Sequence, residues 1–311
     1  MSRVSDMKSE NRLARKKARK RIFRKRLTYG AIIVAVIVLV FFIASSRKSS
    51  ILADNFLFKA AIVDQLSKGG IVPWPNQTFI DSSINILQTK KFEVANYSYE
   101  EATVNFYMNL SERGYGLIIL RVHSAIVEGS TLLGLFTSEI YNNMTYPWQQ
   151  STGQLVKAFH TQGGPVFFAV APGFVDFSMQ GAFQNTIIIL MGCDGMKYTN
   201  MAEAFVRKGA KVCIGWSGFV DAEHTDKAIS YLLKCLVTYR YNVNNAVNET
   251  MQVMGPAPVY NSTLKYYPAS AGDFTIPPYT GLTSNIAEIA IFLTRETERI
   301  SPIQLLLRRC L

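Results

Sequence analysis

The sequence predicts a three-layer α/β domain with a mainly parallel sheet, preceded by one transmembrane helix. Two observations predict the sheet: the runs at residues 115–122 and 186–192 are almost wholly apolar and rich in Ile and Leu, and amphipathic stretches lie between such runs. Continuous apolar strands are typical of a sheet that is covered by helices on both faces. A third observation, an uncharged run at residues 27–44, predicts the membrane span.

The positive charge of the chain is concentrated at its N-terminus. Residues 1–26 hold twelve of the 33 Lys and Arg residues and two of the 22 acidic residues, so they account for +10 of the net charge of +11. A basic tail suits anionic lipid or nucleic acid. Because an apolar span follows directly, we interpret residues 1–26 as a cytoplasmic tail that orients the span and contacts membrane lipid.

The 18 uncharged residues at 27–44 are just long enough to cross a hydrocarbon core of roughly 30 Å. The alternative is a cleaved signal peptide, whose apolar core is usually shorter and whose basic region is usually smaller. We expect an uncleaved signal-anchor, a linker at residues 45–58 and an extracellular domain at residues 59–311, which places the protein in the cell membrane with its N-terminus in the cytoplasm.

Six Asn-x-Ser/Thr sequons support a translocated domain, since chance predicts roughly two. The alternative is that Asn-rich turns produce sequons that carry no sugar. The candidate glycosylation sites are Asn76, Asn96, Asn109, Asn143, Asn248 and Asn261.

The elements expected after the linker alternate between strands and helices. Strands are predicted at residues 59–66, 92–97, 115–122, 186–192 and 211–216, although residues 59–66 also fit a helix. Helices are predicted from residue 75 to 87 and at residues 103–113, 201–208 and 221–241. Residues 124–185 are too long for a simple crossover and are expected to add a hairpin or flap, and residues 286–293 fit either a late strand or a helix.

Two chemically active side chains follow strongly apolar strands. His123 comes directly after the run at 115–122, and Cys193 comes directly after the run at 186–192. Ligands of parallel α/β sheets meet the C-terminal ends of the strands, so we expect both side chains at one edge if the strands are neighbours. A His beside a Cys can take the thiol proton, and the thiolate then attacks a carbonyl carbon.

Nearby residues could complete such a site. Backbone N–H groups at Cys193 and near Ser124 could bind an oxyanion, and Gly192 and Gly195 could let the chain turn tightly and a substrate backbone approach. The alternatives are structural, because a Cys at a strand end is often core and His123 could be an ordinary strand-edge histidine.

The order of elements, with His after the third strand and Cys after the fourth, resembles the caspase-like cysteine peptidases, among them caspases, gingipains and the CHAT domains. The segment NMAEAFVRKGAKVCIGW at residues 200–216, followed by Ser217 and Gly218, is similar to the helix, turn and strand that follow the nucleophile in gingipain-type and CHAT-type members. The resemblance covers about residues 59–240. It implies a Cys193/His123 dyad that cleaves a protein or peptide near the membrane, with the substrate strand along residues 217–220.

The sequence also departs from that family. Ser124 stands where the family usually has Gly, and the 70-residue separation of His123 and Cys193 requires an insertion. No acidic residue directly precedes Cys193. Asp64 and Asp194 are the nearest candidates to contact a basic substrate residue, although both also fit solvated carboxylates at strand ends.

Other functions have weaker signals. No cofactor, metal ion or nucleic acid is expected, because the chain has three His residues, no ligand spacing and no phosphate-binding glycine loop. Cys235 and Cys310 could form a disulfide, which spacing alone cannot show. The alternative function is an inactive caspase-like binding or scaffold module at the cell surface. A two-lobed solute-binding domain is the hypothesis with the least support from the sequence.

Overall fold

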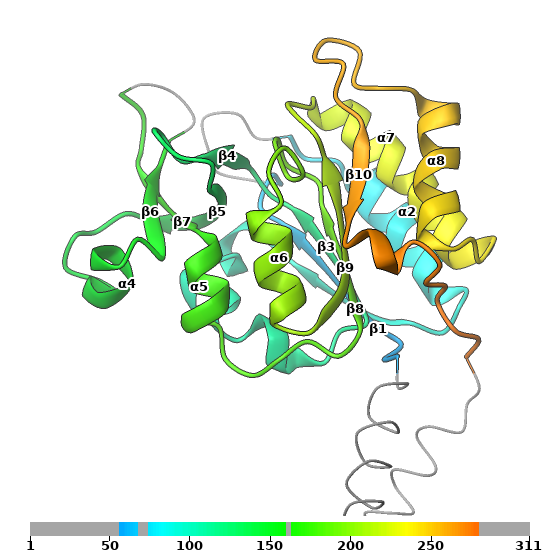
Figure 1. The fold of residues 1–311 in the computed structure, drawn as a ribbon, viewed down its shortest axis with the longest axis horizontal. Helices are drawn as coiled ribbons and strands as arrows, with labels where there is room; N and C mark the ends of the chain where they lie inside the picture. Colours follow the sequence, from blue (N-terminus) through cyan, green and yellow to red (C-terminus); the bar gives the residue numbers. More distant parts are fainter. Residues whose placement is uncertain (1–55, 68–73, 160–162, 280–311) are drawn as a thin grey trace, which may run out of the picture. The chain divides into compact units, whose positions relative to one another are not determined.

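A six-stranded, mainly parallel sheet forms the centre of the domain (Figure 1). The structure is a computed structural model that describes residues 56–67, 74–159 and 163–279. The strand order is β10-β9-β8-β3-β1-β2, and all neighbours are parallel except β10 and β9. The strands are β1 (Lys59–Asp64), β2 (Glu93–Tyr97), β3 (Leu117–Arg121), β8 (Thr186–Leu190), β9 (Ala210–Trp216) and β10 (Leu264–Tyr267).

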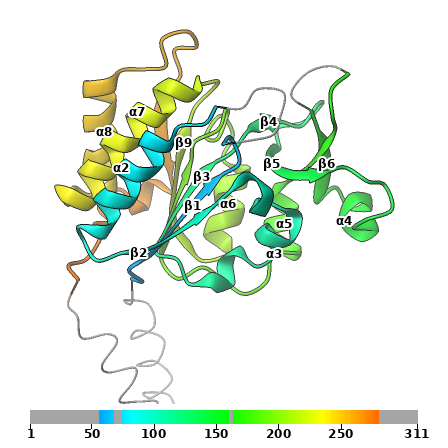
Figure 2. The ribbon, with the colours of Figure 1, turned by 180° about the vertical axis from the view of Figure 1, so that it is seen from behind.

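Helices cover both faces of this sheet, as Figures 1 and 2 show. One face packs against α2 (Gln77–Gln88), α7 (Ala222–Leu233) and α8 (Val243–Met254). The other packs against α3 (Val104–Met108), α5 (Pro172–Phe177) and α6 (Asn200–Arg207). Shorter helical segments are α4 (Pro147–Ser151), the 3₁₀ turns η1 (Tyr99–Glu101), η2 (Leu110–Arg113) and η4 (Ala269–Ala271), and the π-helical turn η3 (Lys234–Thr238).

A second sheet fills the long connection between β3 and β8. Its four antiparallel strands have the order β4-β5-β7-β6. They are β4 (Ser124–Ile126), β5 (Leu133–Ile140), β6 (Leu155–Ala158) and β7 (Phe167–Val170). Leu135 and Phe168 join the core of the main domain, whereas Phe136 and Ala169 belong to a separate apolar cluster. Alternation along each strand sends these residues to opposite faces.

Side-chain caps define two helix starts. Asn76 accepts the Phe79 N–H at the start of α2, and Asp221 accepts the His224 N–H at the start of α7. Each cap satisfies an N–H that has no partner within its helix.

The structure confirms the mixed α/β class, the mainly parallel sheet and all five predicted strands, with ends that differ by a few residues. The predicted flap is the four-stranded sheet, and the predicted helix at 221–241 is α7 continued by η3. β10 and α8 were not predicted. No helix within the described ranges is long and apolar enough to span a bilayer. The predicted tail and span, and the element expected at 286–293, lie outside those ranges.

Candidate active site at the sheet edge

His123 and Cys193 line the same cavity at the C-terminal ends of two neighbouring parallel strands. β3 pairs directly with β8, and Leu120 lies opposite Leu190. His123 follows β3 by two residues, and Cys193 follows β8 by three. The cavity has a volume of about 270 Å³ and is lined by Leu66, Trp74, Val122, His123, Met191, Gly192, Cys193, Val220, Asp221, Ala222, Thr225 and Tyr260.

The backbone of His123 is fixed on both sides. Its N–H donates to Oε1 of Gln65 at 3.0 Å, and its carbonyl accepts the Phe136 N–H at 2.9 Å. The half-buried imidazole lies with its ring centroid 6.0 Å from that of Phe136. The His123 backbone is therefore held between the end of β1 and strand β5, at the edge of the cavity.

The Cys193 thiol is half-buried and is hydrogen-bonded to the backbone. Its Sγ donates to the Val220 carbonyl at 3.6 Å. Burial raises the pKa of the Cys193 thiol, and the negative charges of Asp194 and Asp221 raise it further. These surroundings therefore favour the neutral thiol over the thiolate.

Ser124 and Gly192 join the ends of β3 and β8. The Ser124 hydroxyl donates to the Cys193 carbonyl at 2.6 Å. A Cβ atom at Gly192 would overlap the Ser124 hydroxyl and the Val122 carbonyl. Gly192 thus allows the two strand ends to approach each other, and the Ser124 hydroxyl positions Cys193. The structural role of Ser124 was not part of the sequence interpretation, which assigned Ser124 to an oxyanion site and Gly192 to a tight turn and the approach of substrate.

The tight turn after Cys193 occurs at Asp194 rather than at a glycine. Asp194 has φ of +59°, and its N–H donates to the Gly218 carbonyl at 2.9 Å. Its carboxylate is buried and lies 3.6 Å from Lys197 Nζ. Gly195 is confined by packing, because a Cβ there would lie 3.2 Å from Cβ of Leu190. The expectation that Asp194 is solvated is wrong.

The segment after β9 is bonded within the protein. Ser217 exchanges hydrogen bonds with Thr263 through its N–H and its hydroxyl. The carbonyls of Gly218, Phe219 and Val220 accept bonds from Asp194 N, Ser262 Oγ and Cys193 Sγ. Val220 lines the cavity, whereas Ser217 and Gly218 are not among its lining residues.

Asp64 belongs to a buried ion cluster rather than to the cavity lining. Arg121, which is fully buried at the end of β3, donates to Asp64 Oδ1 at 2.6 Å and to both oxygens of Asp226 at 2.8 Å. It also donates to the Trp74 carbonyl at 2.7 Å, and Asn76 donates to Asp226 at 2.9 Å. Burial raises the pKa of Asp64. The expectation of a solvated carboxylate is wrong for Asp64 as well.

The ion cluster adjoins the cavity. Arg121 donates to the carbonyl of Trp74, and Trp74 lines the cavity. Thr225, which precedes Asp226 in the chain, also lines the cavity. Sequence reasoning missed Arg121 and Asp226. One signal was available, because an Arg at the end of an apolar strand buried on both faces must find anionic partners.

A larger groove covers the outer face of the four-stranded sheet beside His123. It has a volume of about 660 Å³, with Ala125, Gly134 and Ala169 among its lining residues. Phe136 lines this groove and lies beside the His123 ring. The groove is therefore next to the smaller cavity.

No family model and no curated protein matches this chain. Among solved structures it is similar to gingipain R, an Arg-specific cysteine proteinase, with 12% identity and a TM-score of 0.44 over 65% of this chain and 43% of that chain. It is also similar to the complex of the pro- and mature domains of Porphyromonas gingivalis RgpB, with 11% identity and a TM-score of 0.43 over 65% of this chain and 44% of that chain. This chain thus spans less than half of the length of either protein.

The remaining site candidates are dispersed. In the parts of the chain that the structure describes, no three His, Cys, Asp or Glu side chains gather as a metal site requires. Cys193, Cys213 and Cys235 are free thiols, and Cys310 lies outside the described ranges. Of the sequons, Asn96, Asn143, Asn248 and Asn261 are exposed, whereas Asn76 and Asn109 are half-buried.

Proposed function

We propose that the domain is a caspase-like cysteine peptidase that hydrolyses protein or peptide substrates, with Cys193 as nucleophile and His123 as general base. The observation that carries the proposal is the cavity that both side chains line at the ends of β3 and β8. Strand ends of this kind are where parallel α/β sheets place their ligands.

The reaction begins from a neutral thiol. His123 takes the Cys193 proton as Sγ bonds to the substrate carbonyl carbon, and the carbonyl π electrons move to oxygen. As the tetrahedral intermediate collapses, the C–N bond breaks and the leaving amine takes the proton from His123. Water then cleaves the thioester, which releases the acid and restores the thiol.

We also propose that this domain lies outside the cell and is tethered by the span at residues 27–44, with the basic tail in the cytoplasm. The basic tail, the uncharged run and the six sequons support this arrangement. Substrates would then be proteins at or near the membrane surface.

An electrophilic peptide probe with mass-spectrometric mapping tests the peptidase proposal on the full chain. We expect the probe to modify Cys193, and we expect His123→Ala to slow the modification at neutral pH by about 10²-fold or more, the range of general-base contributions. Cys235→Ala is the matched control, since Cys235 is a free thiol outside the cavity lining. Unchanged peptidase activity in Cys193→Ala would overturn the proposal.

The second candidate is an inactive binding or scaffold module. The raised pKa of Cys193 and the two carboxylates beside it favour this candidate, because both stabilise the thiol over the thiolate. In that case the probe would modify Cys193 no faster than a model thiol, and His123→Ala would change nothing.

A further inference from the structure

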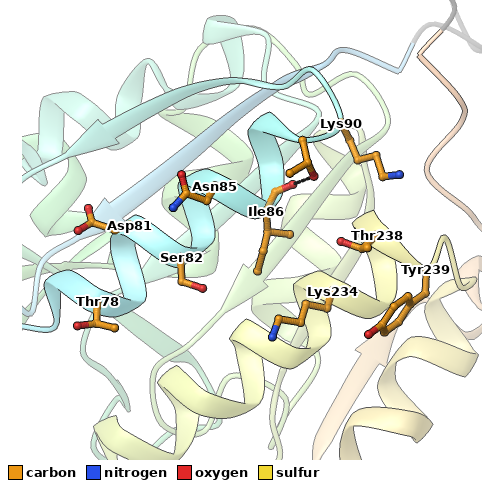
Figure 3. Close-up of a pocket in the computed structure, with 10 residues that line it drawn as sticks. Thr78, Asp81, Ser82, Asn85, Ile86, Lys90, Lys234, Thr238 and Tyr239 are labelled. Carbon is orange, nitrogen blue, oxygen red and sulfur yellow. Dashed lines mark hydrogen bonds between the residues drawn. The ribbon is translucent and has the colours of Figure 1, made fainter.

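A basic trough lies at the N-terminal ends of the parallel strands, away from the candidate active site. It consists of two adjoining cavities of about 800 Å³ and 340 Å³ that share Thr89 and Lys90. The first runs between α2 and η3, where Figure 3 shows Lys234, Thr238 and Tyr239 opposite Ser82 and Ile86. The second is formed with Phe58, Lys91, Arg240 and the segment Ile276, Pro277, Pro278 and Tyr279.

The charge of this trough is strongly positive. Lys90, Lys91, Lys234 and Arg240 line it, and within the described ranges none of them forms an ion pair. Asp81 is the one carboxylate among the lining residues, and it accepts a hydrogen bond from Gln77. Several unpaired cations in one hollow favour an anionic partner.

Aromatic side chains are exposed around the same surface. Tyr239 and Tyr279 are 53% and 49% exposed and line the trough, and the Tyr241 ring lies 5.8 Å from that of Tyr239. η3 is a π-helical turn, which is a rare geometry that is frequent at functional sites. Tyrosines beside cations are typical of surfaces that contact lipid headgroups.

The trough adjoins the point where the described chain begins. Phe58, which lines the trough, directly precedes β1, and Phe56 is where the described chain begins. Eleven residues separate Phe56 from the end of the uncharged run at residue 44. Fully extended, they reach at most about 40 Å. His123 and Cys193 lie at the opposite ends of the strands, so a domain that rested on this surface would keep the candidate active site directed away from the bilayer.

We propose that the trough formed by Lys90, Lys91, Lys234 and Arg240 docks the domain on anionic phospholipid headgroups in the outer leaflet of the membrane that holds its anchor. The proposal rests on the proposed tether for its geometry and is independent of the chemistry at Cys193. Docking would fix the orientation of the domain and hence which substrates reach the candidate active site.

Hydrogen exchange of the full chain in lipid nanodiscs tests this proposal. Discs of phosphatidylcholine alone are compared with discs that also contain phosphatidylglycerol. We expect slower exchange at residues 88–91 and 238–241 in the anionic discs only, and we expect added salt to remove the difference. In Lys90→Ala/Lys91→Ala/Arg240→Ala the protection should be lost, since each removed cation lowers the ratio of docked to undocked domain about fivefold.

Lys157→Ala/Lys227→Ala/Lys265→Ala is the matched control, because it removes three exposed cations that do not line the trough. Equal exchange in the two kinds of disc, or protection that survives the first triple variant, overturns the docking proposal. Failure of the tether is a separate result, since the chain would then not co-elute with phosphatidylcholine discs. If the tether fails, the docking proposal is still supported when the chain co-elutes with the anionic discs only and Lys90→Ala/Lys91→Ala/Arg240→Ala abolishes that co-elution. Co-elution with neither kind of disc overturns the docking proposal.

Discussion

The hydroxyl of Ser124 donates a 2.6 Å hydrogen bond to the carbonyl oxygen of Cys193. This bond connects the residue after His123 with the candidate nucleophile, across the ends of β3 and β8. Because Ser124 is only 8% exposed, water cannot easily replace it as a donor.

Ser124→Ala should therefore loosen the turn at Cys193. We expect a loss of about 1–3 kcal/mol in the free energy of unfolding, since a buried acceptor loses its partner, together with slower modification of Cys193 by an electrophilic probe. Urea titration and labelling kinetics measure the two effects. Ser130→Ala is the control, because its hydroxyl makes a similar bond to the Val127 carbonyl on the exposed surface. Equal behaviour of both variants would contradict a positioning role.

Arg121→Met should be among the most destabilising substitutions in the domain. It leaves Asp64 and Asp226 buried without their cation, which costs about 3–5 kcal/mol. Arg207→Met is a matched control, because Arg207 binds both oxygens of Asp176 but its side chain is 55% exposed. We expect that control to cost at most about 1 kcal/mol in the same denaturant titration. A small loss in both variants would show that the cluster is not needed for stability.

The pH dependence of Cys193 labelling should reflect its raised pKa. With a small thiol reagent, we expect the rate to rise with pH to a midpoint above about 8.5, the value of a free thiol. Asp194→Asn should lower that midpoint, since it removes one of the two negative charges. A rate plateau already present at neutral pH would instead indicate a thiolate paired with protonated His123, and would contradict the neutral resting thiol.

The same shift has a consequence for stability. The folded protein keeps the Cys193 proton to a higher pH than the unfolded chain does. Cys193 thus contributes stability that is fully present below the ordinary thiol pKa and is lost as the pH rises through the raised value. In denaturant titrations at several alkaline pH values, the free energy of unfolding should fall more steeply with pH for wild type than for Cys193→Ala. Equal slopes of unfolding free energy against pH in the two proteins would contradict this contribution.

The sequon at Asn76 should be structural whether or not it carries sugar. Asn76 caps α2 by accepting a hydrogen bond at its side-chain Oδ1, and its side-chain Nδ2 donates to Asp226. Asn76→Gln should cost about 0.5–2 kcal/mol of unfolding free energy in protein made without glycosylation. Asn143→Gln, at an exposed sequon, should cost nothing measurable in the same thermal or urea titration. An unchanged Asn76→Gln protein would show that the cap is dispensable.

The sequence by itself determined five of the six strands of the main sheet and four of the six helices that cover it. Apolar runs such as 115–122 and 186–192 can only be buried on both faces, so they predicted β3 and β8 and a mainly parallel sheet. Placing His123 and Cys193 after those runs followed from the same pattern. β10 was missed because it is a short edge strand that follows a Gly- and Pro-containing segment, and α8 was missed because it contains three Asn residues, which are weak helix formers.

Only the tertiary structure decided which polar groups meet. The pairing of β3 with β8 brings Ser124 to the Cys193 carbonyl, and burial of Arg121 draws in Asp64 and Asp226 from segments 57 and 105 residues away in the chain. No local pattern specifies such partners, because a buried charge or hydroxyl is satisfied by whatever the fold brings near it. Periodicity reports which face of a strand or helix is buried, whereas the contacts across those faces depend on how the elements pack.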